Sequence, residues 1–230
     1  MIPKIIHYCW FGGKGKPEAV RLMIQTWKLY CPDYQLKEWN ETNFDIHINR
    51  YCREAYEQRK WAFVSDVARM YALYNEGGIY MDTDVEVVRS LDSLLDNPAF
   101  LGFEGTKWIA TSILGTEPNN PVIRSFMDSY NSRSFVREDG SLDQTTNVEE
   151  WTKLLVDKFG LQLNGKKQCA AGFNIFPADY FTPYDYLTGR LHRTDNTYTI
   201  HWFGQSWINN KPWRTKLSQW YHRLRGIKME

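Results

Sequence analysis

The side chains best suited to chemistry are Asp82 and Asp84, two residues apart at the end of the apolar run IYM, residues 79–81. Residues i and i+2 of a strand project to the same face, roughly 6.5–7 Å apart along it, so we expect both carboxylates to point the same way. Ligands of α/β sheets collect beyond the carboxyl ends of parallel strands, where paired carboxylates can hold a divalent cation that bridges phosphate oxygens. The alternative is a solvated strand end, because about one D-x-D triplet arises by chance in such a chain.

A second polar pair lies on the predicted helix that runs into this strand. Asp66 and Arg69 are spaced i and i+3 beside Ser65, off the apolar stripe of that helix. An aspartate that accepts from hydroxyls, next to an arginine with its fork of donors, can clamp a sugar or a phosphate. The alternative is a solvated ion pair that stabilises the helix slightly.

The elements that must position these residues alternate between strand and helix. We predict strands at 4–13, 34–40 and 79–84, with helices at 16–32 and 60–78 and one further helix before residue 60. The stripe of the first helix consists of apolar residues: Val20, Met23, Ile24, Trp27 and Leu29. The later segments are predicted as strands at 100–103, 109–115 and from 198, and as helices at 119–130 and 148–160. This order predicts an α/β fold with a mostly parallel central sheet.

Composition limits the class of protein. The chain of 230 residues has 28 basic and 27 acidic residues, so no charge excess argues for a nucleic-acid partner. Its four cysteines are widely spaced, which indicates free thiols in a reducing compartment. We find neither a signal-peptide layout nor an apolar stretch of membrane-spanning length, so we expect a cytoplasmic protein. Without a linker or an internal repeat, a single domain over 1–230 is expected.

Three segments carry a resemblance to a known family. They are IPKIIHYCWFGG (2–13), RKWAFVSDVARMYALYNEGGIYMDTDVEVV (59–88) and HWFGQSW (201–207). Together they resemble the D-x-D glycosyltransferases of family 32, which include bacterial capsular polysaccharide transferases and fungal initiating mannosyltransferases. The catalytic domains of the clostridial glucosylating toxins are more distantly similar. The resemblance covers about the first 95 residues, and an asparagine expected near residue 111 is missing.

The resemblance implies a GT-A, Rossmann-like fold. It also implies that a hexose is transferred from a nucleotide sugar with retention of configuration and with Mn²⁺ or Mg²⁺ bound. The most expected donor is a UDP-sugar. By this resemblance 1–95 is the nucleotide-sugar half, and 96–210 is the acceptor half with the late metal and phosphate loop. The expected acceptor is a glycan or a lipid-linked oligosaccharide, in bacterial capsule or surface polysaccharide synthesis.

The resemblance also assigns roles to single residues. Asp84 would bind the metal directly, and Asp82 would reach the ribose and, through water, the metal. Asp66 and Arg69 would hold the donor sugar and its phosphate side. Four further residues of the expected site are Trp10, whose ring would stack on uracil, His201 as a metal ligand, and Ser206 and Trp207 as donors to the β-phosphate. For Trp10 the alternative is an ordinary core aromatic, and for His201 a structural histidine.

Two other classes of function remain open from the sequence. A metal-dependent phosphohydrolase or nucleotidyltransferase would share the carboxylates, although we find neither a P-loop nor a lysine-rich phosphate loop. A non-catalytic glycan-binding module would suit the aromatic content of 16% but would not need paired aspartates. No other carboxylate stands out as a catalytic nucleophile.

The segment 211–230 has a composition of its own. It holds six basic residues and one acid, and its apolar residues repeat with helical spacing: Trp213, Leu217, Trp220, Tyr221 and Leu224. A basic amphipathic helix with tryptophans suits the surface of an anionic membrane, so we expect peripheral membrane contact here. The alternative is a terminal helix that packs its stripe on the domain.

Overall fold

The computed structural model describes residues 1–204. Its helices are α1 (Glu18–Tyr30), α2 (Arg50–Glu57), α3 (Trp61–Glu76), α4 (Pro121–Ser129), α5 (Asn147–Phe159) and α6 (Ala178–Phe181), with 3₁₀ turns at Asp92–Leu94 and Tyr130–Ser132. Its strands are β1 (Ile5–Cys9), β2 (Gln35–Trp39), β3 (Gly78–Met81), β4 (Val85–Val87), β5 (Ala99–Glu104), β6 (Trp108–Thr116), β7 (Gln168–Ala170), β8 (Phe173–Phe176), β9 (Tyr184–Asp185), β10 (Arg190–Leu191) and β11 (Thr199–His201). Across this described part, no helix combines the length and apolar character that crossing a bilayer requires.

The central sheet has seven strands in the order β2-β1-β3-β6-β5-β8-β7. β1 is parallel to both β2 and β3, and β5 is parallel to β8. β6 is antiparallel to β3 and β5, and β7 is antiparallel to β8. Two strands, β6 and β7, therefore oppose the other five, so the predicted α/β class with a mostly parallel central sheet is confirmed.

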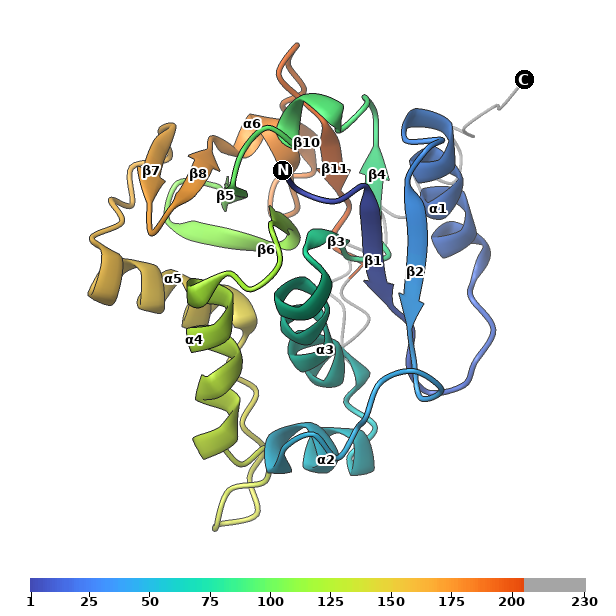
Figure 1. The fold of residues 1–230 in the computed structure, drawn as a ribbon, viewed down its shortest axis with the longest axis vertical. Coiled ribbons are helices and arrows are strands. Elements are labelled where there is room, and N and C mark those ends of the chain that lie inside the picture. The colour runs from blue at the N-terminus through green and yellow to red at the C-terminus, as the bar shows by residue number, and fades with distance from the viewer. Residues whose placement is uncertain (205–230) are drawn as a thin grey trace.

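Helices cover both faces of this sheet (Figure 1). One apolar cluster joins α3 and α5 to the sheet through residues such as Val67, Trp151 and Phe103. The other joins α1 to the sheet through Trp27, Ile6 and Ile79. Most strands of the central sheet contribute to both clusters because their side chains alternate between the faces, which is why these strands read as nearly continuous apolar runs.

The turn from α3 into β3 is short and depends on two glycines. Gly77 and Gly78 both have positive φ, 65° and 91°, and a Cβ at Gly78 would lie 2.7 Å from the carbonyl oxygen of Ile5. The buried His7 fixes this turn: its Nδ1 accepts from Trp39 Nε1 at 3.0 Å, so its Nε2 carries the proton and donates to Gly77 O at 2.8 Å. Consequently the start of β3 is held against β1.

A second, two-stranded sheet pairs β4 with β11, far apart in the sequence but antiparallel in space. Trp27 of α1 fixes β4, because its Nε1 donates to Val85 O at 2.8 Å. Thr26 Oγ1 also accepts from Val87 N at 3.0 Å. The first helix therefore positions the strand that follows Asp84.

The prediction that Leu29 belongs to the buried stripe of α1 is wrong. Leu29 is 67% exposed, whereas Trp27 is completely buried. Residues two apart in a helix lie about 200° apart around its axis, so Leu29 cannot share the face of Trp27. The short strands β4, β7, β8, β9 and β10 and the single turn of α6 were not predicted, because each is too short to show a periodic pattern.

Candidate active site

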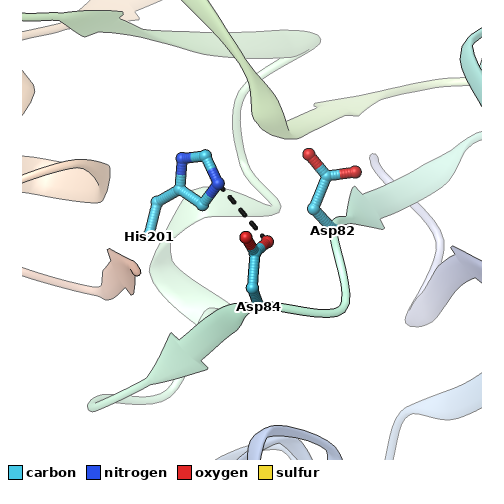
Figure 2. Close-up of side chains that lie close together, drawn as sticks. All are labelled: Asp82, Asp84 and His201. Atoms are coloured by element: carbon cyan, nitrogen blue, oxygen red, sulfur yellow. Dashed lines mark ion pairs between the residues drawn. The ribbon is translucent and has the colours of Figure 1, made fainter. Parts of the chain in front are cut away.

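Asp82, Asp84 and His201 come together at the ends of three different strands, as Figure 2 shows. One oxygen or nitrogen atom from each residue can be chosen so that all three lie within 4.8 Å of one another. Asp82 follows β3, Asp84 precedes β4, and His201 ends β11. The antiparallel pairing of β4 with β11 sets His201 opposite Val85, directly after Asp84, and so carries the histidine to the aspartates.

The two aspartates converge for a different reason from the one predicted. β3 ends at Met81, so Asp82 and Asp84 do not share the face of one strand. They belong to a turn in which Val85 N donates to Asp82 O at 3.1 Å, while Asp82 N donates to Ser112 O on β6 at 2.8 Å. The turn, rather than strand alternation, brings the carboxylates together.

Asp84 is tied to both the histidine and the chain that follows it. Its Oδ1 lies 3.3 Å from His201 Nε2, and its Oδ2 accepts from Gly204 N at 2.5 Å. Burial raises the pKa of Asp84, but the neighbouring His201 and the Gly204 N–H outweigh burial, so the net shift is downward. Burial lowers the pKa of His201, but Asp84 outweighs it together with Asp82 and Glu104, so that pKa is raised. The Asp84 carboxylate therefore favours the imidazolium form of His201.

Arg69 links the helix to the aspartates through a buried network. Its Nη2 lies 2.9 Å from Asp66 Oδ1 and 3.2 Å from Asp82 Oδ1, and its Nη1 donates to Thr111 O at 2.6 Å. The guanidinium carbon lies 4.5 Å from the centre of the Tyr80 ring, whose hydroxyl donates to Asp82 Oδ1 at 3.0 Å. The alternative of a solvated Asp66–Arg69 pair is therefore wrong, and one guanidinium serves two carboxylates.

The sharing of one guanidinium leaves Asp66 poorly compensated. Burial raises the pKa of Asp66 to about 6, opposed by Arg69 and reinforced by Asp82. Burial also raises the pKa of Asp82, opposed by Arg69 and reinforced by Asp84. A site that holds buried carboxylates against their preference for water is poised for a cation or for hydroxyl donors.

The donor atoms fit a divalent cation. Two carboxylates and an imidazole are ligands of the kind that Mn²⁺ accepts, and the raised pKa of Asp82 shows a buried carboxylate whose desolvation Arg69 and His201 do not fully offset. Among the described residues, Asp82, Asp84 and His201 are the only set of three or more metal-ligating side chains gathered in this way.

Trp10 lies at the same edge of the sheet as Asp82. It directly follows β1, which is parallel to β3 with His7 opposite Tyr80. Its indole Nε1 donates to Lys14 O at 2.6 Å, and the residue is only partly buried. Trp10 is therefore not a fully buried core aromatic. Ser206 and Trp207, predicted as phosphate donors, lie outside the described residues.

Two residues near the aspartates were missed in the sequence. Tyr80 reads as a core residue of its strand, yet its hydroxyl donates to Asp82 and its ring supports Arg69. Glu104 ends β5 and acts electrostatically on both Asp82 and His201, as the pKa of its own carboxyl reflects. The only sequence signal for Glu104 was a charged residue closing the apolar strand FLGF before Gly105.

Comparison with known proteins finds a family match over the part of the chain that holds the two aspartates. Residues 17–101 match the family model described as the glycosyltransferase sugar-binding region containing a DXD motif. The similarity to this family model covers 85 of the 230 residues. The match includes Asp66, Arg69, Asp82 and Asp84, and it confirms the resemblance to D-x-D glycosyltransferases and, with the observed sheet, the GT-A class of fold. Trp10 and His201 lie outside the matched region.

Individual relatives are similar over part of the chain. Inositol phosphoceramide mannosyltransferase 3 of Schizosaccharomyces pombe is 29% identical over 130 residues, 53% of this chain and 35% of that protein. The human alpha-1,4-N-acetylglucosaminyltransferase is 30% identical over 102 residues, 42% of this chain and 28% of that protein. The chain thus matches about a third of each curated relative. Among solved structures, the galactosyltransferase LgtC with donor and acceptor sugar analogues has a TM-score of 0.46 and 14% identity, covering 94% of each chain.

Proposed function

We propose that this protein is a metal-dependent, retaining glycosyltransferase that moves a hexose from a UDP-sugar to a glycan or lipid-linked oligosaccharide. The observation that carries the proposal is the convergence of His201 with Asp82 and Asp84, the two aspartates of the matched DXD sugar-binding region. We place the reaction in the synthesis of a bacterial capsule or surface polysaccharide, as the resemblance of the sequence suggests.

Asp84 and His201 would hold Mn²⁺ or Mg²⁺, with Asp82 beside them. A cation bound there neutralises the charge that develops on the leaving diphosphate. The depressed pKa of Asp84 keeps that carboxylate ionised and ready to bind a cation. The Gly204 N–H fixes one oxygen of Asp84, so the orientation of this ligand is set before substrate arrives.

Asp66 and Arg69 would hold the donor sugar and its phosphate side. Asp66 lies beside the Arg69 guanidinium, which Thr111 O and Asp82 already fix. The Asp66 carboxylate is therefore oriented before the substrate binds, and no binding energy is needed to orient it. Trp10 would stack on the uracil, and Ser206 and Trp207 would donate to the β-phosphate. The position of the partly buried Trp10 directly after β1 supports this role.

The proposed step is a displacement on the front face of the sugar. The bond from the anomeric carbon to the phosphate oxygen breaks, and its electron pair leaves with the nucleotide. The acceptor oxygen forms a bond to the same face of that carbon, and the hydroxyl proton passes to the departing phosphate oxygen. The retained configuration follows from the shared face.

The curated relatives support a hexosyl donor. One is named a mannosyltransferase and the other an N-acetylglucosaminyltransferase, so both names describe hexose transfer. A thermal-shift screen over UDP- and GDP-sugars with Mn²⁺ tests the donor class, because a ligand that binds only the folded state raises the unfolding temperature. We expect stabilisation by a UDP-sugar that disappears in EDTA.

Product analysis separates this proposal from its alternatives. A transferase releases free UDP and places the sugar on an acceptor, whereas a phosphohydrolase cleaving the diphosphate releases sugar phosphate. A glycan-binding module binds free glycan with neither metal nor nucleotide. Release of sugar phosphate, or stabilisation by glycan alone, contradicts the proposal.

We propose that the protein works in the cytoplasm, in peripheral contact with the membrane through segment 211–230. The support is its sequence, which holds six basic residues and regularly spaced tryptophans. We expect the full chain to float with anionic liposomes and a chain truncated after Lys211 not to. Equal flotation of both chains, or of neither, contradicts the membrane role.

A further inference from the structure

The end of the β5–β6 hairpin carries a carboxylate and an exposed tryptophan side by side. Glu104 of β5 lies opposite Trp108 of β6 in the antiparallel register, so the two side chains project from the same face. Trp108 is 44% exposed, although most large apolar residues of β5 and β6 are buried. Within residues 1–204, the side chain of Glu104 has no hydrogen bond or ion pair, and the residue is only partly buried.

This face of the hairpin is directed to the metal-ligating side of the molecule. Gly102, two residues before Glu104, shares its face, and a Cβ there would lie 2.4 Å from Phe181 Cδ2 of α6. Thr182, which follows α6, donates its hydroxyl to Phe103 O at 2.8 Å and so joins the end of β5 to the segment leading to β9. Glu104 therefore faces α6 and the strands beyond it, and not the core under α5.

A short series of rings continues from this segment to His201. Tyr186 lies 4.7 Å from Phe203, and Phe203 lies 4.0 Å from His201, measured between ring centres. The charge of Glu104 acts on Tyr186, whose pKa is raised by burial and then by Glu104. Burial raises the pKa of Glu104 itself, opposed by His201 and reinforced by Asp82. Ser112 O on β6 accepts from Asp82 N at 2.8 Å, so the hairpin that carries Glu104 and Trp108 runs beside the Asp82 turn, whereas Asp66 and Arg69 belong to α3.

We propose that Glu104 and Trp108 form the binding subsite for the acceptor sugar, an inference that rests on the proposed function. The Trp108 indole offers a flat apolar surface to the face of a pyranose ring, and Glu104 accepts hydrogen bonds from its hydroxyls. A carboxylate repels the diphosphate of the donor, so an uncharged polyol is the partner that suits Glu104. The subsite selects a neutral sugar residue at the acceptor end.

The test compares acceptor binding with donor binding in the same variants. The probes are UDP with Mn²⁺, measured by calorimetry, and a panel of methyl glucosides, galactosides and mannosides, measured by ligand-detected NMR in the presence of UDP and Mn²⁺. The variants are Glu104→Gln and Trp108→Ala, and the matched control is Glu138→Gln, whose residue is exposed.

We expect at least one glycoside to bind the wild type and the control, and to lose about tenfold in affinity in Glu104→Gln and in Trp108→Ala. Affinity for UDP with Mn²⁺ should change less than twofold in both variants. The inference is overturned if no glycoside binds the wild type, if both variants bind it unchanged, or if UDP binding falls together with glycoside binding. Failure of the wild type to bind UDP with Mn²⁺ overturns the proposed function itself, and this result is distinct from the others.

Discussion

Replacing Arg69 with methionine tests whether the network beside the aspartates is buried and interdependent. The Arg69 side chain is 6% exposed and contacts Asp66 at 2.9 Å, Asp82 at 3.2 Å and Thr111 O at 2.6 Å. Removing one partner of a buried ion pair typically costs about 3–5 kcal/mol, because the remaining charge stays buried without compensation. Here two carboxylates lose the same partner, so we expect the upper part of that range.

The assay is urea unfolding at pH 7.5 in EDTA, followed by tryptophan fluorescence. The matched control is Arg124→Met, since Arg124 pairs with Asp128 at 2.8 Å but is 52% exposed. A surface pair of this kind contributes about 0–1 kcal/mol. The double variant Asp66→Asn/Arg69→Met should recover part of the loss, because it removes one of the uncompensated charges. A cost for Arg69→Met no larger than that of the control would refute the buried network.

Three further predictions concern the nucleotide, the pH dependence and the metal. Trp10→Ala should lose about 1–3 kcal/mol of UDP affinity by calorimetry with folding intact, whereas Trp108→Ala should keep it, and equal affinities in the two variants would remove Trp10 from the base site. Because burial raises the pKa of Asp66 to about 6, the folded state holds that proton more tightly than the unfolded state, and stability falls as pH rises from about 4 to 6. The free energy of unfolding of Asp66→Asn, relative to that of the wild type, should therefore rise by about 3 kcal/mol between pH 4 and 7. A difference between the two proteins that stays constant with pH would show that the pKa of Asp66 is not raised in the folded state. Since the pKa of His201 is raised, Mn²⁺ binding below that pKa should release a proton, seen as a dependence of the calorimetric heat on the buffer, and His201→Gln should abolish that dependence.

The parts of the fold that were predictable have long, regular sequence patterns. Helix α3 and its glycine ending were predicted because its apolar residues repeat over about three turns and Gly77 and Gly78 follow soon after. The β4–β11 pair was not predictable, because three-residue strands show no period and their pairing joins segments more than a hundred residues apart. The placement of His201 depends on that pairing, so its role was implied by resemblance alone.

In the candidate site, too, some features were predictable from the sequence and others were not. The identity of Asp82 and Asp84 was evident from their spacing and context, whereas the turn that directs them was not. Asp66 and Arg69 looked like a solvated pair as readily as a clamp, because helical spacing does not show which polar residues a neighbouring strand covers. Glu104 closes an ordinary apolar strand, and only the packing of β5 against α6 shows where it points.

The central claim is that the aspartates and His201 hold a cation that binds the donor diphosphate. Its most direct test is calorimetry of UDP in Mn²⁺ with the wild type, with Asp84→Asn, and with Asp96→Asn as a control at an exposed aspartate. We predict that the wild type and Asp96→Asn bind UDP only when Mn²⁺ is present, and that Asp84→Asn, folded as judged by its unfolding transition, loses this binding. UDP binding by Asp84→Asn as tight as that of the wild type, or wild-type binding unaffected by EDTA, would contradict the claim.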